Sequence, residues 1–389
     1  MRRVYFDNNA TTPVLPEVMA AMQPYFSERF GNASSIHRDG QSARAAVEHA
    51  RESVAVLLRC KASEVVFTSG GTEADNLAIF GSVQAGDHVI TSTIEHHAVW
   101  NSCRHLEAMG CGVTYVPVDG NGLVDPQDVR DALRPNTKLI SIMLANNETG
   151  VLQQVAEIGR VGAEAGVCFH TDAVQAAGKI PIDVNEIGCD LLTISGHKIH
   201  APQGEGALFV RKGRQLQAML YGGRHERSRR AGTENVPGIV GLGKAVELAT
   251  HGLKNGDTLK IAVLRDRIEK TLLEQIDGCG VNSGGVTRVC NTSNIYFDSV
   301  EGESLVIALD LKGLAVSSGA ACSSGASEPS HVLTAMGLRS DRARASVRFS
   351  LGKQNTSDEV DFAISLVPKT VERLRELSPV YTKRAQLTT

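Results

Sequence analysis

Two segments far apart in the sequence carry side chains suited to covalent chemistry. Cys322 lies in a run of small residues (315–327) that can bend and bring a thiol close to a substrate. Lys198 follows a hydrophobic stretch (191–195), where burial can lower the pKa of an amine and fix its approach to a carbonyl. Alone, the first segment is also explained as a linker and the second as a surface lysine. Together they predict sulfur chemistry on an amino acid.

A second group of residues is suited to binding a phosphate. Residues 68–73 (Thr-Ser-Gly-Gly-Thr-Glu) end a predicted strand and begin a helix, so that Gly71 and Thr72 can face an anion at the helix N-terminus. The segment lacks the Gly-Lys-Ser/Thr ending of a P-loop, which favours a phosphate monoester over a nucleoside triphosphate. Ser195 and His197 follow another strand and can reach the same phosphate. A plain helix cap by Thr72 is the alternative.

Further polar residues follow predicted strands, at the edge where open α/β sheets bind ligands. Asp172 can pair with the protonated ring nitrogen of pyridoxal phosphate, although an isolated aspartate more often forms a turn. His96 can stack on a flat cofactor and transfer protons, but the adjacent His97 leaves the choice open. The side-chain amides within residues 146–150 can bind a phenolate or carboxylate oxygen. Alternatively, this segment simply forms a tight turn.

An arginine completes the candidate site. Arg348 lies within a strand pattern (346–352), and its planar guanidinium can bind a carboxylate through two hydrogen bonds. Because Arg342 and Arg344 are close by in the sequence, an exposed basic face is the alternative.

The composition predicts a globular protein of two domains. The chain has 389 residues, of which 42% are hydrophobic and 21% charged. A net charge of −3 and 4% aromatic residues give no reason to expect nucleic acid or an anionic membrane as a partner. The eight cysteines include no C-x-x-C pair, which indicates reduced thiols that are mostly packed in the core. Without an export signal or a bilayer-spanning run, we expect a cytoplasmic protein.

Short β-rich runs alternate with helical patterns, which is typical of an α/β fold with a mainly parallel sheet. We expect a large cofactor-binding domain (15–255) and a small α+β domain (1–14 and 256–389) that carries the cysteine loop, with a junction at 251–257. The predicted strands of the large domain are 65–68, 88–92, 112–116, 139–143, 168–172, 191–195 and 207–210, and its predicted helices include 43–58, 73–81, 98–109 and 158–165. In the small domain we expect strands at 293–297 and 345–350 and helices at 261–276, 304–311 and 357–377.

In their order along the chain, these motifs resemble those of cysteine desulfurases of the NifS/IscS type, within the class V, fold-type-I pyridoxal phosphate enzymes. That fold has a mainly parallel seven-stranded sheet covered by helices, plus a small α+β domain. The cysteine segment resembles the group with a long Ser-Ser-Gly-x-Ala-Cys loop. The motifs that carry the resemblance lie at 6–12, 68–73, 95–98, 146–150, 171–175, 195–198, 230–235, 317–322 and 347–352.

The resemblance implies a role for each candidate residue. Lys198 would hold pyridoxal 5′-phosphate as a Schiff base, with Asp172 on the pyridine nitrogen and His96 over the ring. The residues implied around the phosphate are Gly71, Thr72, Ser195 and His197, together with Thr233 from the other subunit of a homodimer. The residues implied at the phenolic oxygen are Asn147 and Gln175, and those implied at the substrate carboxylate are Arg348 and Asn147.

The implied activity converts L-cysteine to L-alanine. The thiolate of Cys322 would attack the substrate sulfur and keep it as a persulfide, for transfer to an acceptor such as an iron–sulfur scaffold or a tRNA-thiolation carrier. A selenocysteine lyase, another aminotransferase or a kynureninase-like hydrolase of the same family is the alternative. A sulfur-carrier platform, which is not primarily an enzyme, is a further alternative. No intrinsic metal site is expected, and the sequence leaves open whether Cys322 ligates a cluster during transfer.

Two segments depart from the family pattern. Residues 199–206 read Ile-His-Ala-Pro-Gln-Gly-Glu-Gly, where the family more often has Tyr-Gly-Pro-Lys-Gly-Val-Gly. Glu205 and the missing lysine predict an altered charge near the cofactor, and hence changed kinetics rather than changed chemistry. The residues after 378 are few and lack the longer tail that some members use to dock a scaffold, so the acceptor stays open.

Overall fold

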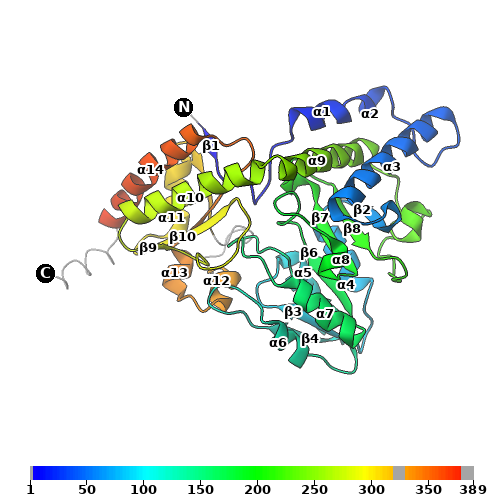
Figure 1. Ribbon diagram of the computed structural model, residues 1–389, viewed down its shortest axis with the longest axis horizontal. Helices are drawn as coiled ribbons and strands as arrows, with labels where there is room; N and C mark the ends of the chain where they lie inside the picture. Colours follow the sequence, from blue (N-terminus) through cyan, green and yellow to red (C-terminus); the bar gives the residue numbers. More distant parts are fainter. Residues whose placement is uncertain (1–2, 319–328, 378–389) are drawn as a thin grey trace.

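The computed structural model describes residues 3–318 and 329–377. A seven-stranded sheet forms the centre of the larger half of the molecule (Figure 1). Its strand order is β2 (Val65–Thr68), β8 (Gly206–Val210), β7 (Leu191–Ser195), β6 (Cys168–Asp172), β5 (Thr137–Ser141), β3 (His88–Ser92) and β4 (Gly112–Val116). Strand β8 is antiparallel to both of its neighbours and every other pair is parallel. The predicted mainly parallel α/β sheet is thus confirmed.

The strands are buried because helices cover both faces of this sheet. Successive residues of β2 point to opposite faces of the sheet. Val65 and Phe67 belong to the main core on one face, and Val66 belongs to the core beneath α4 on the other. The helices of this half are α1 (Pro16–Met22), α2 (Pro24–Ser27), α3 (Arg38–Leu58), α4 (Gly71–Phe80), α5 (His97–Ala108), α6 (Pro126–Asp131), α7 (Val155–Ala165), α8 (Val184–Ile187) and α9 (Val236–Lys254). Helices α3 and α9 pack closely, because Gly243 leaves no side chain between itself and Ala50.

The predicted elements differ from the observed ones mainly where polar residues take part. Strand β5 begins at Thr137, two residues before the predicted start, because the Thr137 hydroxyl lies 2.8 Å from Nδ1 of His88 and is satisfied inside the sheet. The expected junction at 251–257 is wrong in extent. Helix α9 continues to Lys254, and only a short turn at Gly256, with φ of 76°, separates it from α10 (Asp257–Gln275).

A second core lies beside the first and is built from both ends of the chain. It contains a four-stranded antiparallel sheet with the order β12 (Ser317–Ser318), β13 (Ser346–Ser350), β10 (Thr292–Phe297) and β9 (Cys279–Val281). Strand β1 (Val4–Tyr5) pairs in parallel with β11 (Leu314–Ala315), and Phe6 is buried in this second core. The helices of this half are α10, α11 (Gly302–Asp310), α12 (His331–Ala335), α13 (Ser340–Arg344) and α14 (Ser357–Glu376). The two separate cores support our proposal of two domains, 15–255 and 1–14 with 256–389.

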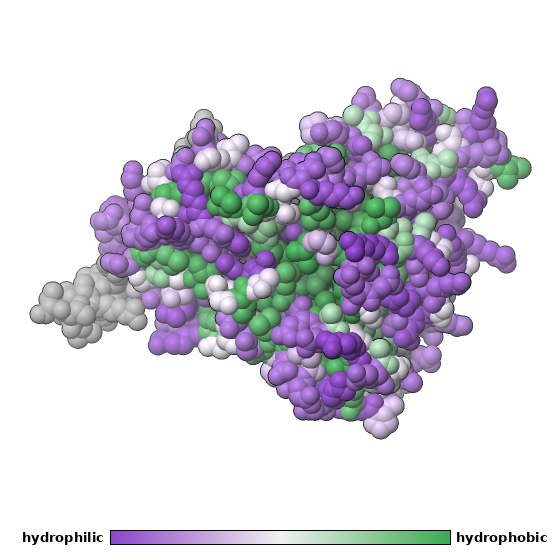
Figure 2. Space-filling view, viewed as in Figure 1, coloured by the Kyte–Doolittle hydropathy of each residue, from purple (hydrophilic) through white to green (hydrophobic). Residues whose placement is uncertain are grey.

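In the described part of the chain, none of the helices is both long and apolar enough to cross a bilayer. Hydrophilic side chains cover most of the rim of the face in Figure 2, and hydrophobic ones gather toward its middle.

Candidate active site

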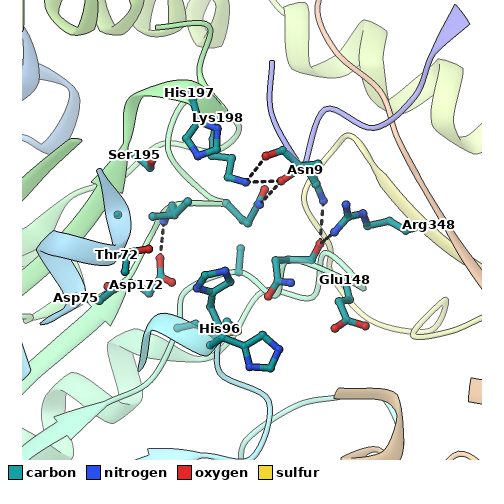
Figure 3. A pocket seen from close by; sticks show the side chains of 18 of the residues that line it. Asn9, Thr72, Asp75, His96, Glu148, Asp172, Ser195, His197, Lys198 and Arg348 are labelled. Carbon is teal, nitrogen blue, oxygen red and sulfur yellow. Dashed lines mark hydrogen bonds between the residues drawn. The ribbon is translucent and has the colours of Figure 1, made fainter. Parts of the chain in front are cut away.

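A cavity of about 460 Å³ lies where the carboxyl ends of the sheet strands meet the second core (Figure 3). Most of the residues that sequence reasoning singled out line it together. These are Gly71, Thr72, His96, Asn147, Asp172, Gln175, Ser195, His197, Lys198 and Arg348. Thr233 is exposed and does not line the cavity of its own chain. Cys322 lies outside the described residues.

The amino group of Lys198 is held by the N-terminal segment of the chain. Lys198 sits in the turn after β7, which is fixed by a hydrogen bond from the Gly196 N–H to the carbonyl of Glu205. Its Nζ donates to the carbonyl oxygens of Asn9 and Ala10, each at 2.7 Å. The amine therefore points into the cavity from a defined position, as Schiff-base chemistry requires.

Two buried carboxyl groups form the floor of the cavity. Asp172, at the end of β6, accepts a hydrogen bond from the Val174 N–H at 2.8 Å, and Oδ1 of Asp75 has no hydrogen-bond partner. Burial raises the pKa of both carboxyls, and the charge of Asp172 raises the pKa of Asp75 further. Ligand atoms of Asp75, Asp172 and His96 lie within 4.8 Å of one another. This floor is therefore suited to a cationic group, which would favour the ionised form of Asp172.

His96 is fixed as a neutral imidazole over this floor. It is the N-cap of α5, and its Nδ1 accepts a hydrogen bond from the Ala98 N–H at 3.1 Å, so that the neutral ring carries its proton on Nε2. Burial and the charge of Lys198 lower the pKa of His96 to about 4. His97 also lines the cavity, but its ring packs against His331, with 4.9 Å between ring centroids. The capped position favours His96 as the residue at the reacting centre.

The N-terminus of α4 offers the place for an anion. Gly71 begins this helix, and a Cβ there would lie 2.9 Å from Val174 Cγ2 and 3.3 Å from the Cβ of Ser195, so only glycine leaves the approach open. Nδ1 of His197 lies 3.1 Å from the hydroxyl of Thr11, and burial lowers the pKa of His197 to about 4. Backbone N–H groups and neutral side chains thus offer hydrogen-bond donors to an anion here, which is typical of phosphate sites at helix ends.

Arg348 enters from β13 on the opposite side of the cavity. Its Nη2 pairs with Oδ1 of Asp7 at 2.8 Å, and its Nη1 donates to the carbonyl of Asn147 at 2.9 Å. Its Nε and the Oδ1 of Asn147 are buried and have no hydrogen-bond partner. Because unpaired buried polar atoms are costly, these two point to a polar ligand, and a carboxylate fits the arginine.

Sequence reasoning missed several residues of this site. Asp7 and Asn9 belong to the recognised motif at 6–12, but no role followed from the sequence because their partners lie more than 130 residues away. Asp75 carried no local signal, and Glu148 lies in the recognised motif at 146–150 but received no role of its own. Buried Glu148 accepts a hydrogen bond from the Ser330 hydroxyl at 2.6 Å, and burial raises its pKa to about 7.

The departure at Glu205 lies behind the cavity rather than in it. The carboxyl group is buried and accepts a hydrogen bond from the side-chain amide of Asn235, the N-cap of α9. Burial raises its pKa to about 8. Arg230 and Glu73, which pair at 2.8 Å, are the nearest charged groups. Glu205 can therefore influence the α4 end of the cavity only through its neighbours.

The chain is similar to known proteins over nearly its whole length. A family model described as aminotransferase class-V matches residues 4–362. The protein "Cysteine desulfurase IscS" of Methanosarcina thermophila is 49% identical over 386 residues, covering 98% of this chain and 95% of that protein. A solved NifS-like protein matches 96% of this chain and 100% of its own, with 35% identity and a TM-score of 0.89. A structure described as "SspA in complex with cysteine" covers 90% of this chain and 99% of its own, with 38% identity and a TM-score of 0.80.

Proposed function

The chain belongs to the class-V aminotransferase family, and we propose that it is a cysteine desulfurase that converts L-cysteine to L-alanine and keeps the sulfur on Cys322 as a persulfide. The observation that carries this proposal is one cavity lined by the Lys198 amine, the Asp172 carboxyl and the Arg348 guanidinium. The names of the near relatives favour a desulfurase over a selenocysteine lyase or another aminotransferase.

The cavity fits pyridoxal 5′-phosphate. The buried acid pair at its floor suits a cation, the glycine at the start of α4 leaves room for a phosphate, and the Lys198 amine lines the same cavity. Lys198 would carry the cofactor, and Asp172 would pair with its ring nitrogen. The cofactor supplies an electron sink that weakens bonds at the substrate carbons. The residues that would hold its phosphate are Gly71, Thr72, Ser195 and His197, and the residues at its phenolic oxygen would be Asn147 and Gln175.

The residues of the chain would orient the substrate, transfer protons and accept the sulfur. Arg348 and Asn147 orient the substrate through its carboxylate, and the neutral ring of His96 and the Lys198 amine hold and transfer protons. The Cys322 thiolate attacks the substrate sulfur, so that a sulfur–sulfur bond forms as the carbon–sulfur bond breaks. The bonding electron pair stays with the β-carbon, which takes up a proton and becomes the methyl group of alanine.

A homodimer and a sulfur acceptor complete the proposal. Thr233 is exposed, and its segment is anchored to the phosphate end of its own chain by the pair of Arg230 with Glu73. This position suits a contribution to the partner subunit's phosphate site. The persulfide would pass to an acceptor protein such as an iron–sulfur scaffold, in the cytoplasm. The curated relatives named IscS support that class of acceptor.

The test compares wild-type protein with its Cys322→Ala variant. We expect a yellow protein that releases alanine and, with a reductant, sulfide from L-cysteine. The variant should keep the colour and lose at least 99% of the sulfide, roughly the loss expected for a nucleophile. The control is Cys290→Ala, because burial raises the pKa of the Cys290 thiol and it lies outside the active-site cavity. Activity that survives in Cys322→Ala would instead point to a lyase, and a protein that cannot be reconstituted with the cofactor would refute the assignment.

A further inference from the structure

Lys179 faces the candidate site from behind. It follows β6 in the chain, is half-buried, and does not line the active-site cavity. It lines a second, smaller cavity of about 80 Å³, whose wall also includes Lys198. Lys198 thus lies between the two cavities. The proposed cofactor and substrate would occupy the first cavity, and Lys179 lines the second.

The amino group of Lys179 contacts two side-chain amides. Its Nζ donates to Oε1 of Gln175 at 2.7 Å and to Oδ1 of Asn9 at 3.1 Å. Within the described residues, no carboxylate forms an ion pair with it. A half-buried ammonium group that contacts only neutral oxygens is partly desolvated without a compensating charge, so its retention calls for a role.

Hydrogen bonds connect Lys179 through Gln175 and Asn9 to the amino group of Lys198. Because Lys179 holds the oxygen of the Gln175 amide, the nitrogen of that amide is left to donate to the Asn9 carbonyl, at 3.0 Å. The same carbonyl accepts the hydrogen bond of Lys198 at 2.7 Å. The side chain of Asn9 also donates to the carbonyl of Asn147, beside Arg348. Asn9 is therefore fixed through both its side chain and its carbonyl.

The charge of Lys179 depends on pH near neutrality. Burial lowers its pKa to about 7, the positive charges of Lys198 and Arg348 act in the same direction, and Cys290 opposes them. The other titratable groups of the second cavity are His200, Asp257 and Lys353. The hydrogen bonds of Lys179 are charge-assisted below pH 7 and weaken above it.

We propose that Lys179 is a positioning residue of the active site, which holds Gln175 and Asn9 so that the Asn9 carbonyl aims the amino group of Lys198 at the cofactor. The proposal rests on the pyridoxal phosphate function argued above. Lys179 itself touches neither the cofactor nor the substrate.

The first test follows the N-terminal segment in the protein as purified. We expect Lys179→Met to raise amide hydrogen exchange at residues 8–12 by about tenfold, because the hydrogen bond from Lys179 to Asn9 is lost together with the one that orients Gln175 toward the Asn9 carbonyl. The matched control is Lys353→Met. Lys353 lines the same second cavity but pairs with Asp257 at 3.1 Å and contacts neither Gln175 nor Asn9.

The second test measures the dissociation constant of pyridoxal 5′-phosphate against pH. Relative to wild type, we expect Lys179→Met to bind about tenfold more weakly at pH 6 and less than about threefold more weakly at pH 8.5, where the wild-type lysine has lost its charge. Lys179→Gln keeps a neutral donor, so we expect about threefold weaker binding without the pH step. Lys353→Met should follow the wild type throughout.

Each result decides between the two proposals. Unchanged exchange in Lys179→Met overturns the positioning role, whether or not the protein binds the cofactor. Faster exchange with unchanged cofactor affinity overturns it too, because Lys179 would then serve the fold alone. If Lys179→Met exchanges faster but the wild-type protein binds no cofactor, the proposed function is refuted. Lys179 would then be a residue that orders Asn9.

Discussion

At the residue scale, the site is defined by ionisable groups that burial holds away from their ordinary state. Asp75 and Asp172 share one buried floor, so both cannot carry a charge there without a cation beside them. His96 is kept neutral next to Lys198, and because its Nδ1 lone pair accepts the hydrogen bond of the Ala98 N–H, its Nε2 proton faces the reacting centre at neutral pH. These groups suit the proposed cofactor, which would bring its own positive ring nitrogen.

Glu205 gives a prediction at the same scale. Burial raises its pKa from the ordinary 4.5 to about 8, so between these values the folded protein holds a proton that the unfolded chain has lost. Stability therefore falls as the pH rises through this range. We expect Glu205→Gln to match the wild-type melting temperature at pH 4.5 and to exceed it by a few degrees at pH 8.5, which corresponds to about 1–3 kcal/mol.

The control for this measurement is Glu303→Gln, because Glu303 is exposed on α11. It should leave the melting temperature unchanged at both pH values. A difference between Glu205→Gln and wild type that stays constant from pH 4.5 to 8.5 would show that Glu205 is not held protonated in the folded protein.

At the element scale, helix α4 and the N-terminal segment at 7–12 approach the cavity from two sides. Helix α4 presents its N-terminus where β2 ends, which is the reason an anion is favoured there. The N-terminal segment crosses from the second core and places the carbonyls of Asn9 and Ala10 against Lys198. A helix end is thus available for the phosphate of the proposed cofactor, while an irregular segment orients the amine.

Gly71→Ala tests the role of the α4 N-terminus. Alanine favours a helix by up to about 1 kcal/mol, but its Cβ would press against Val174 and Ser195. We therefore expect little change in melting temperature and at least about tenfold weaker binding of pyridoxal 5′-phosphate, measured by titration of the cofactor-free protein. Gly120→Ala, where a Cβ meets nothing closer than 4.0 Å, should leave the affinity unchanged. If Gly71→Ala and wild type bind pyridoxal 5′-phosphate with equal affinity, the phosphate does not bind at this helix end.

At the scale of the whole molecule, two cores enclose one site, and the proposed homodimer adds a residue from outside the chain. Asp172 ends strand β6 of the first core's sheet, Lys198 lies in the turn after β7, and Arg348 belongs to β13 of the second core. Thr233 reaches no cavity residue of its own chain, so its proposed role depends on the partner.

A mixed dimer of Lys198→Ala and Thr233→Asp chains tests this dependence. Each homodimer should be inactive, because one lacks the Schiff-base lysine and the other places a carboxylate against the phosphate. If Thr233 acts across the interface, one site of the mixed dimer is intact, and we expect roughly half of the wild-type sulfide production. The measurement uses two affinity tags to isolate the mixed dimer. A mixed dimer no more active than its parents would place Thr233 in the site of its own chain.

Local sequence signals determined the strands, most helix positions and the chemistry of the site. Buried strands read as continuous apolar runs, and the polar residues directly after them, such as Asp172 and Lys198, had to meet at one edge of a parallel sheet. The order of the motifs then indicated the family. Where a polar residue takes part in regular structure, as Thr137 does, the apolar pattern placed the boundary two residues too late.

Only the tertiary structure decided how the reactive groups are held and charged. Asn9 meets Gln175, Lys179 and Lys198 across more than 160 residues of chain, and no local pattern encodes such a contact. The pKa of Lys179 and the acid pair at the floor likewise follow from burial, which depends on how the two cores pack. The sequence by itself thus determined which residues can react, and the packing of distant segments decided their orientation and their protonation.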